Sequence, residues 1–131
     1  MNKNNLCKAA LNALENSYSP YSKCKVGAAL LCENGTVYTG CNIENASFSP
    51  TICAERTAFA KAISEGENKF TAIAVAAQRD GCPTAFLPCG VCRQVMAEFC
   101  KNDFKILVVT DKDNFEEYTL EKLLPDSFKL R

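Results

Sequence analysis

The sequence contains no histidine. This absence excludes a Ser-His-Asp triad and a Cys-His nucleophile pair, because both need an imidazole base. It also excludes every metal site that depends on an imidazole ligand. Acid–base and metal chemistry in this chain must therefore come from thiolates, carboxylates and cationic side chains.

Net charge and long hydrophobic runs are also missing. The 15 Lys and Arg residues balance 15 Asp and Glu residues, so the chain lacks the basic character typical of proteins that bind nucleic acid or anionic membranes. No apolar run approaches the length of a membrane span, and residues 1–19 lack the continuous apolar region of a secretory signal. We therefore expect a cytoplasmic protein with no nucleic-acid partner and no membrane partner.

Cysteine, in contrast, is abundant. The chain has nine cysteines in 131 residues, and an odd number cannot all pair within one chain. In a reducing compartment such residues serve as metal ligands more often than as disulfides. The length fits one domain that covers residues 1–131 and buries its own core.

Hydrophobic periodicity predicts an α/β fold. Asn34-Gly35 between two apolar runs is a strong hairpin signal, because both turn positions must tolerate positive φ. The predicted elements are a helix (5–17), a hairpin (26–32 and 36–42), a helix (52–65), a strand (70–77), a loop (78–87), a helix (88–100), a strand (105–110), a short edge strand (117–119) and a helical turn (120–124). This order predicts a three-layer α/β/α sandwich with a mixed five-stranded sheet.

Three cysteines stand in a pattern that the other six lack. Cys53 and Glu55 belong to a C-A-E sequence that opens one predicted helix, and Cys89 and Cys92 belong to P-C-G-V-C, which opens the next. Side chains in a first turn lean toward the helix N-terminus, so these groups could share one space. Three protein ligands leave the fourth position of a tetrahedral zinc ion open for water, as in catalytic sites. The pattern is typical of zinc deaminases in their three-cysteine form, with Glu55 as the acid–base group.

Three thiolates would leave the zinc cluster with a net negative charge. The two helix N-termini supply partial positive charge. Arg56 and Arg93, which follow ligand cysteines, could also donate hydrogen bonds to the thiolates. We expect Arg56 to do so and Arg93 to have a structural role.

From about residue 19 to residue 128 the sequence closely resembles the small homotetrameric cytidine deaminases. The matching stretches are PYSKCKVGAALL, GCNIENASFSPTICAERTA, PCGVCRQVMAEF and EKLLPDSF. The resemblance implies a cytidine deaminase-like fold, one Zn²⁺ per subunit and a homotetramer. It also implies hydrolysis of cytidine and deoxycytidine to uridine and deoxyuridine with release of ammonia, in pyrimidine salvage.

The resemblance also implies roles for individual residues. Glu55 would shuttle protons between the attacking water, ring N3 of the base and the leaving amine. Asn42 and Glu44 would bind the ribose hydroxyls, and the backbone around Ala54 would read the exocyclic edge of the base. Phe128 would lie close to an active site, that of a neighbouring subunit.

Three positions depart from the family pattern. Cys24 stands where relatives carry an aromatic residue that stacks on the pyrimidine, so Cys24 would line the base pocket without a stacking face. Phe48 replaces a frequent Tyr, and Leu87 replaces a small polar residue. None of them is a predicted metal ligand.

Other interpretations of the same residues remain open. The three cysteines could be buried free thiols, Glu55 a helix-start carboxylate, and Asn42 and Glu44 residues that only order a loop. A zinc-stabilised binding module would need a fourth ligand, for which Cys82 is the candidate, but it would not need an acid–base carboxylate. A blasticidin-type nucleoside deaminase and a polynucleotide-editing enzyme are the rival enzymes, and N-I-E-N and the zero net charge disfavour them.

Overall fold

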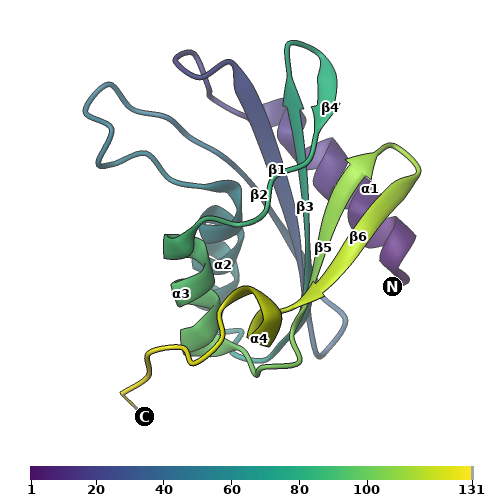
Figure 1. The fold of residues 1–131 in the computed structure, drawn as a ribbon, viewed down its shortest axis with the longest axis vertical. Helices are drawn as coiled ribbons and strands as arrows, with labels where there is room; N and C mark the ends of the chain where they lie inside the picture. Colours follow the sequence, from purple (N-terminus) through teal and green to yellow (C-terminus); the bar gives the residue numbers. More distant parts are fainter. Residues whose placement is uncertain (131) are drawn as a thin grey trace.

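A mixed β-sheet forms the centre of the molecule and carries helices on both faces (Figure 1). The computed structural model describes residues 1–130. Its elements are α1 (Lys3–Ala13), a 3-10 turn (Leu14–Asn16), β1 (Cys24–Cys32), β2 (Val37–Cys41), α2 (Ala54–Ser64), β3 (Phe70–Arg79), β4 (Cys82–Thr84), α3 (Gly90–Phe99), β5 (Lys105–Asp111), β6 (Asn114–Thr119) and α4 (Leu120–Leu123). Among these residues, no helix is long and apolar enough to cross a membrane.

The strand order β2-β1-β3-β5-β6 confirms the predicted mixed sheet. β3 and β5 are parallel and are connected through α3, whereas the other neighbouring strands are antiparallel. The sheet has six strands rather than the predicted five, because β4 pairs with the end of β3. β4 lies in the segment 78–87 that was expected to be a loop. It is only three residues long and contains Pro83, so it carries no alternating pattern.

The predicted hairpin is present between β1 and β2. Gly35 adopts a φ of 90°, which an L side chain would disfavour. Asn34 supports the turn by accepting a hydrogen bond from the backbone N–H of Thr36 at 3.0 Å. The strand register places Gly40 opposite Ala28 and Cys41 opposite Gly27.

Two hydrophobic cores flank the sheet and make the three layers. On one face, α1 and the following 3-10 turn pack Leu6, Ala10 and Leu14 against alternate residues of β1, β3 and β5. On the other face, α2, α3 and α4 enclose a larger core around Phe59, whose ring lies 5.2 Å from that of Phe70. Apolar side chains therefore cover the sheet on both sides, as expected for a sheet between two layers of helices.

Two glycines allow helices to approach the sheet closely. A Cβ at Gly40 would lie 2.6 Å from the carbonyl oxygen of Ala54 and 2.6 Å from the backbone nitrogen of Ala58. A Cβ at Gly27 would meet the carbonyl oxygen of Ala10 on the opposite face. Gly40 therefore fixes the first turn of α2 directly on β2.

Candidate metal centre and active site

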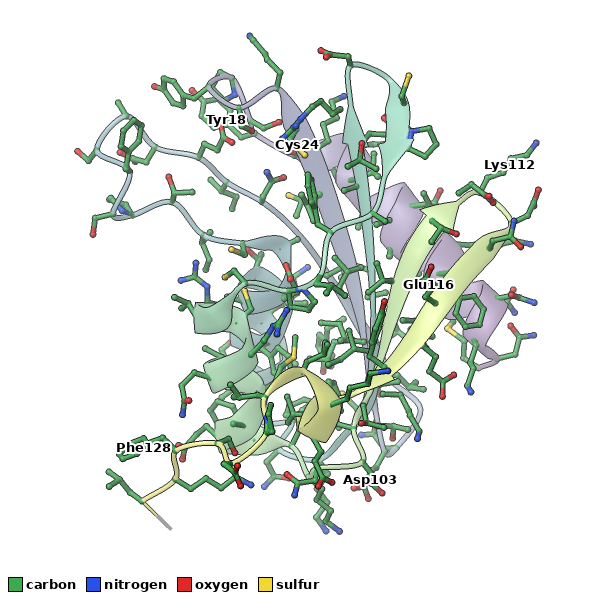
Figure 2. All side chains as sticks on the ribbon, in the orientation of Figure 1. Tyr18, Cys24, Asp103, Lys112, Glu116 and Phe128 are labelled. Carbon is green, nitrogen blue, oxygen red and sulfur yellow. The ribbon has the colours of Figure 1, made fainter. Side chains whose placement is uncertain are left out.

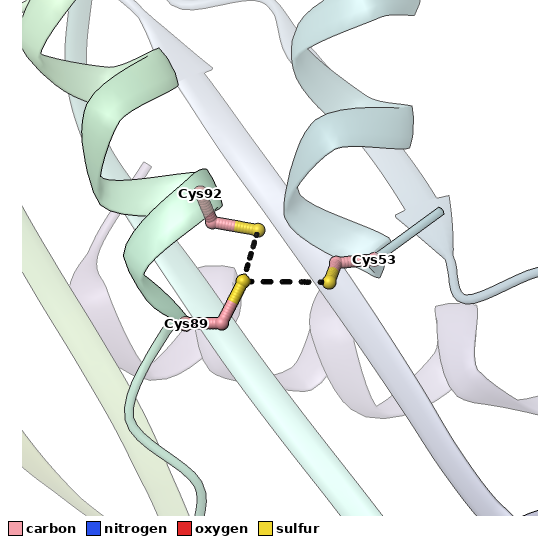
Figure 3. A group of neighbouring side chains, drawn as sticks. All are labelled: Cys53, Cys89 and Cys92. Carbon is pink, nitrogen blue, oxygen red and sulfur yellow. Dashed lines mark hydrogen bonds between the residues drawn. The ribbon is translucent and has the colours of Figure 1, made fainter. Parts of the chain in front are cut away.

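The N-termini of α2 and α3 bring three cysteines together (Figure 3). Cys53 is the N-cap of α2 and Cys89 is the N-cap of α3. Both helices thus begin slightly later than predicted, and Pro88 precedes the cap instead of occupying the first turn. Cys92 lies in the first turn of α3, so its side chain leans back toward the same end of the helix.

The distances between the sulfur atoms fit a zinc ion. The Sγ atoms of Cys53 and Cys89 are 3.7 Å apart, those of Cys89 and Cys92 are 3.6 Å apart, and all three lie within 4.8 Å of one another. Sulfur ligands placed tetrahedrally about 2.3 Å from Zn²⁺ would be separated by about 3.8 Å. Among residues 1–130 this is the only group of three or more potential metal ligands that converge. Cys82 lies outside it, exposed in β4.

The thiol of Cys53 is held in an environment that favours its ionised form. A hydrogen bond from Cys92 lowers the pKa of Cys53, burial opposes this, and hydrogen bonds from Arg56 and Cys89 lower it further, to about 5. The same hydrogen bond between Cys92 and Cys53 raises the pKa of Cys92, and burial adds to the increase. A thiolate is the form that binds zinc, so this cluster favours the ionised form of one of its ligands.

Arg56 and Arg93 have different partners. The guanidinium Nη2 of Arg56 lies 3.4 Å from the Sγ of Cys53. Arg93 instead donates from Nε to the carbonyl oxygen of Pro88 and from Nη1 to that of Leu123, each at 2.6 Å. Arg93 therefore joins the segment before Cys89 to α4, whereas Arg56 contacts the sulfur cluster.

Within residues 1–130, Glu55 is one of two buried polar side chains and is 5% exposed. Burial raises the pKa of its carboxyl to about 7, and the negative charge of Cys53 contributes to the increase. Glu55 is not one of the converging ligand candidates. It lies two residues after Cys53, in the first turn of α2, next to the sulfur cluster rather than in it.

Asn42 is the other buried polar side chain. Its Oδ1 accepts hydrogen bonds from the backbone N–H of Val26 at 2.9 Å and from the hydroxyl of Ser17, and its Nδ2 donates to the carbonyl oxygen of Cys24 at 2.9 Å. An amide nitrogen carries two N–H groups. One donor of Asn42 therefore remains available after these contacts are made.

Glu44 is held in place by the turn at residues 21–22. Its Oε1 accepts hydrogen bonds from the backbone N–H groups of Tyr21 at 2.9 Å and Ser22 at 3.1 Å, and its Oε2 accepts from the hydroxyl of Ser22. Partial burial raises the pKa of Glu44, but these hydrogen bonds outweigh it and lower the pKa. The sequence analysis missed Ser22, because nothing in the residue spacing pairs it with Glu44.

A cavity of about 440 Å³ lies beside Glu44. Its lining comes from the turn at residues 21–22 and from the 44–51 loop, and consists of Tyr21, Ser22, Glu44, Asn45, Phe48 and Thr51. This loop is tied to the fold by a pair of backbone hydrogen bonds between Ile43 and Ile52, each at 3.0 Å. The cavity is large enough for part of a small-molecule ligand.

The remaining predicted site residues lie in different places. Ala54 is fully buried at the start of α2, and Cys24 is 5% exposed at the start of β1. Phe128 is 68% exposed and lies near the C-terminus, at the opposite end of the molecule from Cys24 and Tyr18 (Figure 2). Within one chain, Phe128 is therefore not part of the region around Cys24.

Comparison with known proteins agrees with this geometry. Residues 1–108 match the model of the cytidine and deoxycytidylate deaminase zinc-binding region. The chain is 51% identical to a cytidine deaminase of Sporosarcina psychrophila, over 98% of this chain and 92% of that protein. It is 48% identical to a cytidine deaminase of Halalkalibacterium halodurans, over 98% and 95% of the two chains.

The fold comparison gives the same result. The crystal structure of a cytidine deaminase from Burkholderia pseudomallei superposes with a TM-score of 0.89 at 41% identity, covering 98% of this chain and all of the other. The resemblance thus extends over sequence and fold, and the matched zinc-binding region includes all three cysteines of the cluster. The chain belongs to the cytidine and deoxycytidylate deaminase family that carries this zinc-binding region.

Proposed function

We propose that this protein hydrolyses cytidine and deoxycytidine to uridine and deoxyuridine and releases ammonia. The observation that carries the proposal is the convergence of Cys53, Cys89 and Cys92 on one point, with the buried carboxyl of Glu55 two residues from Cys53. A closed structural zinc site has no use for such a carboxyl. The family and the named relatives support the same activity.

The three cysteines would hold one zinc ion per chain. Zinc with three protein ligands supplies Lewis-acid chemistry, which makes water a competent nucleophile near neutral pH. The N-termini of α2 and α3 direct partial positive charge toward the cluster. Arg56 adds a full positive charge at the sulfur of Cys53 and so offsets part of the thiolate charge.

Glu55 is the proton carrier in this proposal. Its carboxylate would take a proton from the attacking water and pass it to ring N3 as the tetrahedral carbon forms. It would then take the proton of the new C4 hydroxyl and pass it to the departing amine as the C4–N bond breaks. A side chain fixed in a helix's first turn and shielded from solvent suits that role, since general acid–base catalysis depends on position. The backbone at Ala54 would receive the exocyclic edge of the base.

Asn42 and Glu44 would hold the ribose. The free N–H of Asn42 and the unused acceptor capacity of Glu44 can pair with sugar hydroxyls, and both side chains are already fixed by other contacts. Fixed partners lose little conformational entropy when a ligand binds. These contacts favour a free nucleoside as the substrate.

We also propose that the protein works as a homotetramer in the cytoplasm, in pyrimidine salvage. Phe128 and Val91 are 68% and 58% exposed, and such apolar side chains suit burial against another copy of the chain. Phe128 would then contribute to the active site of a neighbouring subunit. Equilibrium sedimentation would give four times 14.3 kDa if this is right, and a monomer under active conditions would refute it.

Ultraviolet absorbance of cytidine tests the activity directly. We expect the purified wild-type protein to remove the cytosine band, and Glu55→Gln to slow turnover by about 100-fold or more while each retains one zinc per chain. Zinc content and circular dichroism serve as controls for folding. A wild-type protein that holds zinc and leaves cytidine unchanged would contradict the proposal.

A further inference from the structure

Arg79, the last residue of β3, lies on the same sheet face as the metal centre. Cys24 of β1 pairs with Arg79 across the two strands, so both side chains point to one face. Alternate residues before them, Ala28 of β1 and Ile73 and Val75 of β3, belong to the core that α2 and α3 cover. Arg79 therefore continues the row of side chains that faces the N-termini of α2 and α3.

The strand register also shows how far the Cys24–Arg79 pair lies beyond the first turn of α2. Gly40 touches the first turn of α2 and lies opposite Ala28. Cys24 is four residues farther along β1, which corresponds to about 13 Å. Cys53 and Cys89 cap the helices at this same end of the sheet. A ligand that rests on them and extends outward would pass the Cys24–Arg79 pair.

The side chain of Arg79 is held by an aromatic ring. The centre of its guanidinium lies 5.5 Å from the centroid of Phe86, a distance at which a cation and a ring attract each other. Phe86 stands three residues before Cys89, in the segment that leads into α3. This contact links Arg79 to the chain segment that delivers a metal ligand.

The environment of Cys24 places Arg79 near the proposed ribose site. Burial raises the pKa of the Cys24 thiol, the nearby guanidinium of Arg79 lowers it, and the charge of Glu44 raises it again. Asn42 in turn donates a hydrogen bond to the carbonyl oxygen of Cys24 at 2.9 Å. Cys24 therefore neighbours both Arg79, its partner across the strands, and Asn42, one of the proposed ribose-binding residues.

No carboxylate neutralises this arginine. Among residues 1–130, Arg79 forms no ion pair, and its side chain is exposed at the end of the strand. A guanidinium is planar, weakly hydrated and stacks on aromatic faces. The neighbouring side chain across the strands is the small thiol of Cys24, which has no aromatic face to compete for that plane.

We propose that Arg79 is a substrate-binding residue whose guanidinium plane stacks on the pyrimidine ring of the bound nucleoside. The inference rests on the proposed function, because it takes the nucleobase to lie between Glu55 and the Cys24–Arg79 pair. Phe86 acts as a positioning residue that holds the guanidinium in place. Stacking of this kind is how Arg side chains contact unpaired bases in proteins that bind nucleic acid.

Equilibrium binding of cytidine in the inactive Glu55→Gln protein tests the proposal without turnover. Adding Arg79→Ala should raise the Kd for cytidine by about 5- to 150-fold, the range found when a stacking side chain is removed from a base. Adding Arg79→Lys should raise it nearly as much, because lysine keeps the charge and loses the plane. Lys25→Ala is the matched control: it removes one positive charge next to Cys24, but on the opposite sheet face, and should leave the Kd unchanged.

Three results with the Arg79 variants would overturn the stacking proposal. An unchanged Kd in Arg79→Ala excludes contact, and a normal Kd in Arg79→Lys means that charge alone acts. A loss of affinity for cytidine 5′-monophosphate without a loss for cytidine would make Arg79 a phosphate contact. Wild-type protein that binds cytidine without deaminating it would contradict the proposed function alone, whereas absence of cytidine binding would contradict both.

Discussion

The guanidinium of Arg56 donates a hydrogen bond from Nη2 to the Sγ of Cys53 over 3.4 Å. The contact with Cys53 raises the pKa of Arg56, while burial opposes this, so the arginine stays charged. Its Nε is buried without a hydrogen-bond partner, which is a cost that the folded protein bears. We infer that Arg56 is kept at this position for its effect on the thiolates.

Arg56→Gln should therefore weaken zinc binding by about 10- to 100-fold, the range found when a group that supports a metal ligand is removed. Competition with a chromogenic chelator measures this affinity. Lys112→Gln is the matched control, because it removes one positive charge from an exposed turn far along the sequence from both helices. Equal zinc affinity and equal turnover in Arg56→Gln and wild type would contradict this role.

Gly40 should control the position of Cys53 and Glu55. In Gly40→Ala, the new methyl group would lie 2.6 Å from backbone atoms of Ala54 and Ala58, so the first turn of α2 must move. We expect a loss of about 1–3 kcal/mol in the free energy of unfolding. Turnover of the folded protein should also fall by about 100-fold, because a shift near 1 Å misplaces the proton carrier.

Gly27→Ala provides the matched comparison. Its methyl group would meet Ala10 and Leu14 on the α1 face, so it should lower stability at least as much. Turnover per folded molecule should nevertheless remain close to that of the wild type. Urea unfolding and steady-state kinetics separate the two effects, and a similar loss of turnover in both variants would show that only general packing matters.

Cys100 should make the folded protein less stable at alkaline pH. Burial raises the pKa of its thiol from 9.0 to about 12. Because the folded pKa lies above the unfolded one, this contribution is fully present below about pH 9 and is lost as the pH rises toward 12. From about pH 7.5 to about pH 10, ionisation of Cys100 in the unfolded chain should cost about 1.4 kcal/mol.

Over that pH interval, the free energy of unfolding should fall by about 1.4 kcal/mol less in Cys100→Ala than in the wild type. Cys82→Ala is the control, since its side chain is already exposed in the fold. Urea titrations at both pH values measure the difference. If Cys100→Ala and wild type lose stability in parallel, the thiol of Cys100 is not responsible.

The features that depend on short sequence patterns could be predicted from the sequence. Asn34-Gly35 specified the hairpin, because positive φ at a turn restricts the residue type. Period-3.6 apolar residues specified the helices, although the 3-10 turn that follows α1 was included in the first helix. The convergence of Cys53, Cys89 and Cys92 followed from their positions at two helix starts.

Features that depend on long-range contacts could not be predicted. β4 forms because three residues find backbone partners at the end of β3, and no side-chain pattern encodes that pairing. The partners of Arg93 include the carbonyl oxygen of Leu123 in α4, which lies 30 residues away in the sequence. The contact between Arg79 and Phe86 likewise exists only once β3, β4 and the segment before α3 have assembled.

Zinc K-edge X-ray absorption of the purified protein would show whether the zinc site is open. We expect three sulfur ligands at about 2.3 Å and one lighter ligand at about 2.0 Å, with the same spectrum in Cys82→Ser. That result would mean an open coordination position bounded by Cys53, Cys89 and Cys92. Four sulfur ligands, or a sulfur lost in Cys82→Ser, would contradict the account and indicate a closed structural site.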